Sequence, residues 1–82
     1  MTRIAAEDLL RDFEDRFGFR PKMERDELGK VQHGLEQTIV NNELANQRHL
    51  LSRAQGDSAR VLRVQLENMI KSARMLGFKT EL

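Results

Sequence analysis

The chain contains 82 residues, with 14 Lys and Arg against 13 Asp and Glu, and it has no cysteine. The length predicts a single domain over residues 1–82, and the missing cysteines exclude a disulfide framework and a cysteine-ligated metal site. A domain of this size buries only about 60–65% of its unfolded surface, so a partner would add useful stability.

Residues 3–17 have the periodicity of an amphipathic helix. At ~100° per residue their apolar side chains share one stripe, and the acidic side chains lie outside it. The stripe contains Ala6, Leu9, Leu10, Phe13 and Phe17. Gly18 suits the end of a helix, and Pro21 disfavours helical backbone in the residue before it. We therefore predict a short helix and a turn within residues 1–21.

Residues 22–56 form the longest segment, and we predict one continuous helix for it. Such a helix would be about 50 Å long at ~1.5 Å per residue, and the acidic residues near its start would interact favourably with its dipole. Gly29 and Gly34 argue against continuity, because each costs about 1 kcal/mol relative to Ala inside a helix. The alternative is a turn over residues 29–34, with the helix beginning near Leu35.

Two apolar stripes run along this segment. The first contains Leu28, Val31, Leu35, Ile39 and Leu50, and the second contains Val40, Leu44 and Leu51. They are turned by roughly 120° from each other, which indicates two neighbours. If the first helix covers one stripe, the chain forms a closed three-helix bundle. If a stripe stays uncovered, it is available to a partner.

Residues 57–82 follow Gly56, which suits the end of the preceding helix. Their apolar side chains alternate three and four residues apart, the a/d pattern of a coiled-coil seam. The seam contains Ala59, Leu62, Leu66, Met69, Ala73 and Leu76. We expect Gly77 to close this helix, Phe78 to pack back on its last turn, and residues 79–82 to fray.

The predicted fold class is therefore all-α. A short N-terminal helix precedes a long central helix, and the C-terminal helix runs antiparallel to the second half of the central one, forming a helical hairpin. No run approaches the roughly 20 apolar residues that span a bilayer, and acids stand where a signal peptide would be apolar. We expect a soluble, cytoplasmic protein without a membrane partner.

Catalytic and cofactor chemistry has little support. The only two histidines, His33 and His49, are far apart in the sequence, and neither Cys nor Tyr is present as a nucleophile or acid. Glu36 is the acid nearest to His33, which is too little for a zinc site. Glycine-rich phosphate-binding patterns are missing. We predict no enzyme activity, no metal and no cofactor, and we expect His49 to be a partly buried structural residue.

Charge is uneven along the chain. Residues 1–47 carry 7 basic and 10 acidic side chains, whereas residues 48–82 carry 7 basic and 3 acidic ones. Four cations of the last helix fall within a sector of roughly 80°, which suits contact with backbone phosphates. They are Arg60, Arg63, Lys71 and Arg74. Glu67 interrupts this row, and a sequence pI near 8.2 is below the value of about 9 typical of nucleic-acid domains. Alternatively the row faces the acidic side of the first helix, or water.

Together these patterns predict a protein-interaction module that associates with itself as a homodimer, an adaptor or regulatory protein acting by binding. Polar Thr38, Asn42 and Asn46 resemble the positions that fix register in self-associating helices. The predicted interface residues are Leu28, Leu35, Ile39, Val40, Leu44 and Leu51. The alternative function is a small basic regulator that binds DNA or RNA through the row of four cations on the last helix.

Overall fold

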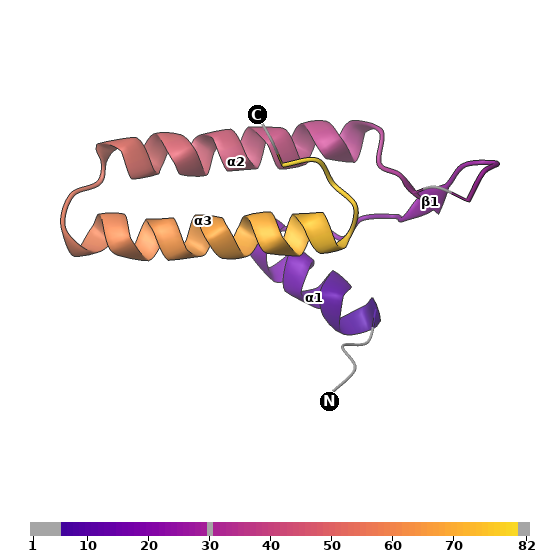
Figure 1. Ribbon diagram of the computed structural model, residues 1–82, viewed down its shortest axis with the longest axis horizontal. Coiled ribbons are helices and arrows are strands. Elements are labelled where there is room, and N and C mark those ends of the chain that lie inside the picture. Colours follow the sequence, from indigo (N-terminus) through magenta and orange to yellow (C-terminus); the bar gives the residue numbers. More distant parts are fainter. Residues whose placement is uncertain (1–5, 30, 81–82) are drawn as a thin grey trace.

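The computed structural model describes residues 6–29 and 31–80 (Figure 1). Its elements in chain order are α1 (Ala6–Phe17), β1 (Glu24–Arg25), β2 (Val31–Gln32), α2 (Leu35–Arg53) and α3 (Asp57–Met75). The three helices, of 12, 19 and 19 residues, contain more than half of the chain. The all-α prediction is therefore confirmed.

Helices α2 and α3 lie side by side and antiparallel, joined by the short turn 54–56 (Figure 1). The predicted seam of α3 faces inward, and its buried members are Leu66, Met69, Ala73 and Leu76. From α2, Val40 and Leu44 complete this contact and are fully buried. The predicted helical hairpin is thus confirmed.

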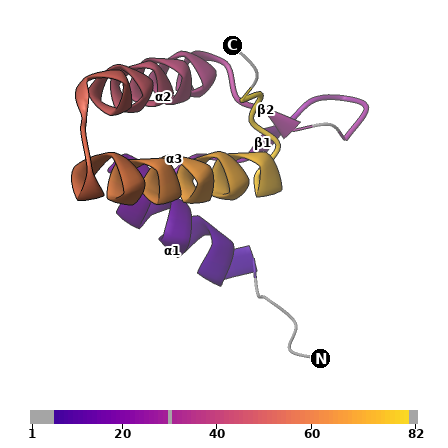
Figure 2. The ribbon, with the colours of Figure 1, turned by 60° about the vertical axis from the view of Figure 1, so that its left-hand side comes forward.

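Helix α1 crosses α3 obliquely, on a different side from α2 (Figures 1 and 2). Its apolar stripe meets the core: Phe13 is fully buried, and Leu9, Leu10 and Phe17 pack around it. The opposite side of the helix is acidic and faces solvent. The amphipathic pattern of residues 3–17 therefore gives the predicted helix over its described part.

Aromatic rings fill one end of the molecule. The Phe13 ring stacks on Phe17 and on Phe78, with centroids 4.4 and 5.1 Å away. Phe78 also stacks on His33 at 3.6 Å, and Phe19 meets Phe13 edge-on at 5.2 Å. Such offset and edge-on pairs add stability beyond the area they bury. The stack joins α1, the two loops that flank the strands, and the residues after α3.

Residues 22–29 and 31–34 are not helical, so the prediction of one continuous helix over residues 22–56 is wrong. They contain a short antiparallel hairpin in which Glu24 pairs with Gln32 and Arg25 with Val31. Helix α2 begins at Leu35, as the alternative interpretation proposed, directly after Gly34. The acidic residues assigned to a helix start lie instead in a strand and a turn.

Local turn chemistry explains this difference. The Leu28 N–H donates to the Asp26 side chain at 2.9 Å, and the Gly29 N–H donates to the Asp26 carbonyl at 3.0 Å. Gly29 adopts φ +78°, a left-handed conformation that glycine tolerates best, and its carbonyl accepts a bond from Arg25. Asp at the first position and Gly at the fourth position of a four-residue segment with these bonds favour a turn over a helix.

The end of α3 has the predicted geometry. Gly77 has φ +87°, and the N–H groups of Gly77 and Phe78 donate to the carbonyls of Arg74 and Ala73. This pair of bonds is a Schellman motif, in which the residue after the glycine folds back on the helix. Phe78 is accordingly buried.

Residues 79 and 80 were expected to fray, and this prediction is wrong. The Gln37 side-chain amide donates to the Lys79 carbonyl at 2.8 Å and accepts from the Lys79 N–H at 2.9 Å. The Arg74 Nε donates to Thr80 Oγ1 at 2.7 Å, and Thr80 is buried. The segment 76–80 therefore crosses from α3 to α2 and closes this end of the hairpin (Figure 2). Residues 81 and 82 lie outside the described residues.

Candidate interaction surfaces

The six predicted interface residues fall into three groups. Val40 and Leu44 are fully buried between α2 and α3, and Leu51 packs partly buried against the same core. These three side chains serve the core of one chain. Helix α3 covers this stripe and α1 packs against α3 instead of α2, so the closed-bundle interpretation, in which the first helix covers one stripe of the central helix, is not supported.

The other stripe of α2 faces solvent. Leu35 is 85% exposed, Ile39 is 46% exposed and Leu50 is 50% exposed. With the exposed polar side chains of Asn42 and Asn46 they lie within roughly 80° of one another around the helix. We call these five residues the α2 outer face.

Leu28 belongs to neither helix face. It lies at the tip of the hairpin turn and is 82% exposed. The sequence had grouped it with Leu35 and Ile39 because a continuous helix would align them. Val31, in the same predicted stripe, is in β2, and its side chain lies outside the described residues.

Charge is distributed unequally along α2. Glu36 and Glu43 lie in its first half, and Arg48 and Arg53 lie in its second half. Glu36 accepts a bond from the Lys22 backbone N–H, and Glu43 accepts one from Gln47. The helix therefore has an acidic half and a basic half on either side of its centre.

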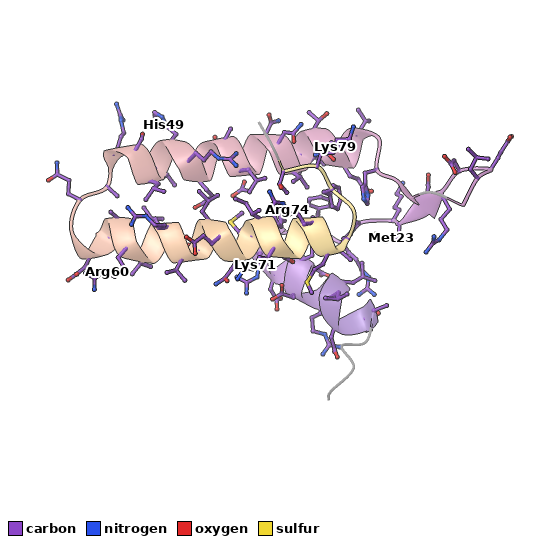
Figure 3. All side chains as sticks on the ribbon, viewed as in Figure 1. Met23, His49, Arg60, Lys71, Arg74 and Lys79 are labelled. Atoms are coloured by element: carbon purple, nitrogen blue, oxygen red, sulfur yellow. The ribbon has the colours of Figure 1, made fainter. Side chains whose placement is uncertain are left out.

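The predicted basic row of α3 is on the surface. Arg60, Arg63, Lys71 and Arg74 are all exposed, and within the described part of the chain none of them forms an ion pair with a carboxylate. Figure 3 shows Arg60 and Lys71 on the side of α3 that lies away from α2. Arg74 lies nearer α2, where its Nε bonds Thr80, so the four exposed cations spread over a sector of roughly 80° of the α3 surface.

The acidic side of α1 has other partners. Asp12 pairs with Arg16 at 3.0 Å, and Glu7 and Glu14 pair with Arg20. A hydrogen bond from Arg20, followed by the Arg20 charge, lowers the pKa of Glu7 below its ordinary value. The bond from Arg16 likewise lowers the pKa of Asp12. The interpretation that the α3 row neutralises these acids is therefore not supported.

Two further cations lie near the end of this row. The Arg48 Nη2 donates to the Thr80 carbonyl at 3.3 Å, while Arg74 bonds the Thr80 hydroxyl. Lys79 is the exposed neighbour of Thr80 (Figure 3). Arg74, Phe78, Lys79 and Thr80 line a surface depression of about 430 Å³. The sequence offered no signal for this grouping, because only the fold brings Arg48 to the carbonyl of residue 80.

The histidines are placed differently from the prediction. His49 is exposed, so its assignment as a partly buried structural residue is wrong (Figure 3). His33 fills that role: its Nε2 lies 2.8 Å from the Leu76 carbonyl, so this nitrogen carries the proton and donates. Among residues 6–29 and 31–80 no three His or acidic side chains are grouped as metal ligands.

Sequence reasoning also omitted exposed apolar residues from its candidate interface. Leu50 completes the α2 outer face, and Val61, Val64 and Met75 are exposed on α3. Leu50 was already assigned to the same predicted stripe as Leu35 and Ile39, and that assignment was the signal that could have added it to the interface.

Comparison with known proteins adds no relative, because no protein family, no curated protein and no solved structure matches this chain. Over the described ranges, none of the helices combines the length and apolar character needed to cross a membrane.

Proposed function

We propose that this protein is a protein-interaction module that associates with itself through the α2 outer face. The observation that carries the proposal is the exposure of Leu35, Ile39 and Leu50 on the side of α2 opposite the core. Three aliphatic side chains on one helix face lose contact with water when a partner covers them. Each one that becomes fully buried contributes about 1.5–3 kcal/mol to the free energy of association, before the entropic cost of association is subtracted.

The charges of α2 favour a second copy as the partner. In an antiparallel pair through the α2 outer face, Glu36 of one copy lies near Arg53 of the other, whereas a parallel pair places like charges together. Arg48 takes no part, because its guanidinium bonds the Thr80 carbonyl of its own chain. The helix dipoles also oppose each other favourably in the antiparallel arrangement. A two-fold axis generates such a pair, in which the same patch is used by both copies.

Register follows from the positions of the side chains. A two-fold axis at the level of residues 44–45 brings Ile39 beside Leu50 of the second copy. The same axis brings Glu36 near Arg53 of the second copy. Asn42 then lies near Asn46 of the second copy, where two amides can bond each other and disfavour a shifted register.

Light scattering after size exclusion tests the proposal directly. We expect the wild-type chain to be dimeric at micromolar concentration, and Ile39→Glu to be monomeric with unchanged helical circular dichroism. Ile39 is about half exposed, so its replacement leaves the core intact. Leu44→Glu is a poorer test because Leu44 is fully buried and the charge would unfold the chain.

Ala45→Glu is the matched control. Ala45 is exposed on α2 but lies roughly 90° from the centre of the α2 outer face. The Ala45→Glu substitution introduces the same charge as Ile39→Glu and lowers helix propensity only slightly. A monomeric wild type at high concentration, or equal loss of the dimer in both variants, would show that this face does not mediate self-association.

A further inference from the structure

We propose that the exposed side of α3, together with residues 79 and 80, binds the phosphate backbone of a nucleic-acid duplex. The surface consists of the row Arg60, Arg63, Lys71 and Arg74, with Lys79 and Arg48 beside it. We call these six residues the basic face. The inference does not depend on self-association, because one chain carries all six cations.

The basic face lacks compensating acids among the described residues. Glu67 is the single carboxylate within the row, and three acids of α1 are paired elsewhere, Asp12 with Arg16 and both Glu7 and Glu14 with Arg20. Unpaired surface cations are the groups that neutralise phosphates and release condensed counterions. The electrostatic requirement for backbone binding is therefore met locally, although the whole chain carries a net charge of only +1.

The tertiary structure extends the row beyond what α3 supplies. Thr80 brings two guanidinium groups together, because Arg48 bonds its carbonyl and Arg74 bonds its hydroxyl. One nitrogen of Arg48, Nη1, is buried without a hydrogen-bond partner in the described structure. Lys79 adds a third cation at the rim of the 430 Å³ depression. This cluster is the strongest concentration of positive charge on the basic face.

Spacing along α3 favours a duplex. Arg60 and Arg63 form one pair and Lys71 and Arg74 a second, and the centres of the pairs are about 16 Å apart at ~1.5 Å per residue. This separation is of the same order as the width of a duplex groove, about 12 Å for the major groove of DNA. The two pairs can contact phosphates on opposite edges of a groove, and Glu67 then lies over the groove between them.

Aromatic side chains argue against a single strand as the ligand. Proteins that bind single strands stack the bases on exposed aromatic rings. The chain has four Phe and neither Tyr nor Trp. All four rings belong to the stack or pack against the core, so the described surface offers no stacking platform.

Fluorescence anisotropy with a labelled 20-base-pair duplex is the appropriate measurement. For about four phosphate contacts the log–log slope of affinity against salt is roughly −3 to −4. We therefore expect on the order of a 100-fold loss of affinity between 50 and 200 mM salt. The labelled single strand of the same sequence should bind more weakly at each salt concentration.

Charge reversal at exposed positions locates the contact. In Arg63→Glu combined with Lys71→Glu, affinity at low salt should fall and the salt slope should decrease by about two, one for each lost contact. Neither side chain has a hydrogen bond or ion pair in the described structure, so the fold is preserved. Arg11→Glu combined with Lys22→Glu is the matched control, since both pairs lower the net charge from +1 to −3.

The outcomes separate the possible ligands. If the Arg63→Glu, Lys71→Glu variant loses duplex binding and the Arg11→Glu, Lys22→Glu control retains it, the basic face is supported as a duplex-binding surface. Absence of salt-dependent duplex binding by the wild type overturns the proposal. Equal losses in both pairs, tighter binding to the single strand, or equally tight binding to poly-L-glutamate overturn it as well, the last by indicating an acidic protein as the ligand.

Discussion

The two ends of the α2–α3 hairpin differ in what surrounds the helix pair. At one end, which we call the closed end, α1, the loops that flank the strands and segment 76–80 pack around the start of α2 and the end of α3. The buried hydrophobic core lies there, namely Phe13, Val40, Leu44, Leu66, Met69, Ala73, Leu76 and Phe78. At the open end, residues 45–65, no side chain is buried.

The difference shows that pairing two helices does not by itself make a core. Two helices touch along one line, and side chains beside that line remain half exposed unless a further layer covers them. Leu51 and Leu62 share the same seam as Leu44 and Leu66 but are only partly buried. The closed end therefore provides most of the stability, and the open end leaves apolar surface such as Leu50 and Val61 available to partners.

The largest effect that separates the two ends is expected for Phe13→Ala. Phe13 is fully buried and contacts three other Phe rings, so its truncation should cost about 3–5 kcal/mol. Leu62→Ala at the open end should cost less than about 2 kcal/mol, because the side chain is only partly buried. Urea denaturation followed by circular dichroism measures both. Equal costs would contradict the contrast between the ends.

An intermediate effect is expected at two glycines, one at each end. Gly77 and Gly56 both have positive φ, where an Ala is strained. Gly77 is the left-handed residue of the Schellman motif, in which an Ala costs about 1 kcal/mol, and an added Cβ there makes only an ordinary contact with His33 Nε2, at 3.4 Å. Gly56 has φ +63° and ψ −135°, a backbone conformation that is essentially restricted to glycine. Gly56→Ala should therefore be the more destabilising in thermal unfolding. The reverse order would show that packing at the closed end outweighs backbone strain at the open end.

The smallest effect concerns acid and α1. Because the pKa of Glu7 and that of Asp12 are lowered in the folded state, their pairs with Arg20 and Arg16 stabilise the chain above the ordinary carboxyl pKa. This stabilisation is lost as the pH falls through the lowered values, so the melting temperature should decrease below about pH 4. Arg20→Gln should reduce that decrease. An identical acid dependence in the variant would show that the Arg20 pairs contribute nothing measurable.

The sequence predicted the helices well where one local pattern was unopposed. In α1 and α3 the apolar period, the following glycine and the absence of internal Pro or Gly agree, and both helices form where expected. In residues 22–34 the signals conflict, since acidic residues favour a helix start while Gly29 and Gly34 favour turns. The hydrogen bonds that Asp26 accepts from Leu28 and Gly29 stabilise the turn. The periodicity of apolar residues gives no information about such bonds.

The candidate surfaces depended even more on the fold. Periodicity identified both stripes of α2 but could not say which faced α3, because each has enough apolar side chains for one contact. The structure places Val40 and Leu44 inside and leaves Ile39 outside. The α3 row was visible from its spacing, but its lack of acidic partners required the positions of Arg16 and Arg20.

The sequence alone determined the all-α class, the amphipathic face of each helix and the helical hairpin, since these follow from interactions between residues a few positions apart. The tertiary structure decided which stripe is core, where the aromatic stack forms, and how residues 79 and 80 are held. Those outcomes depend on contacts such as Phe13 with Phe78 and Gln37 with Lys79, between residues more than 40 positions apart. Local sequence patterns cannot identify such pairs, because the residues come into contact only when the chain is packed.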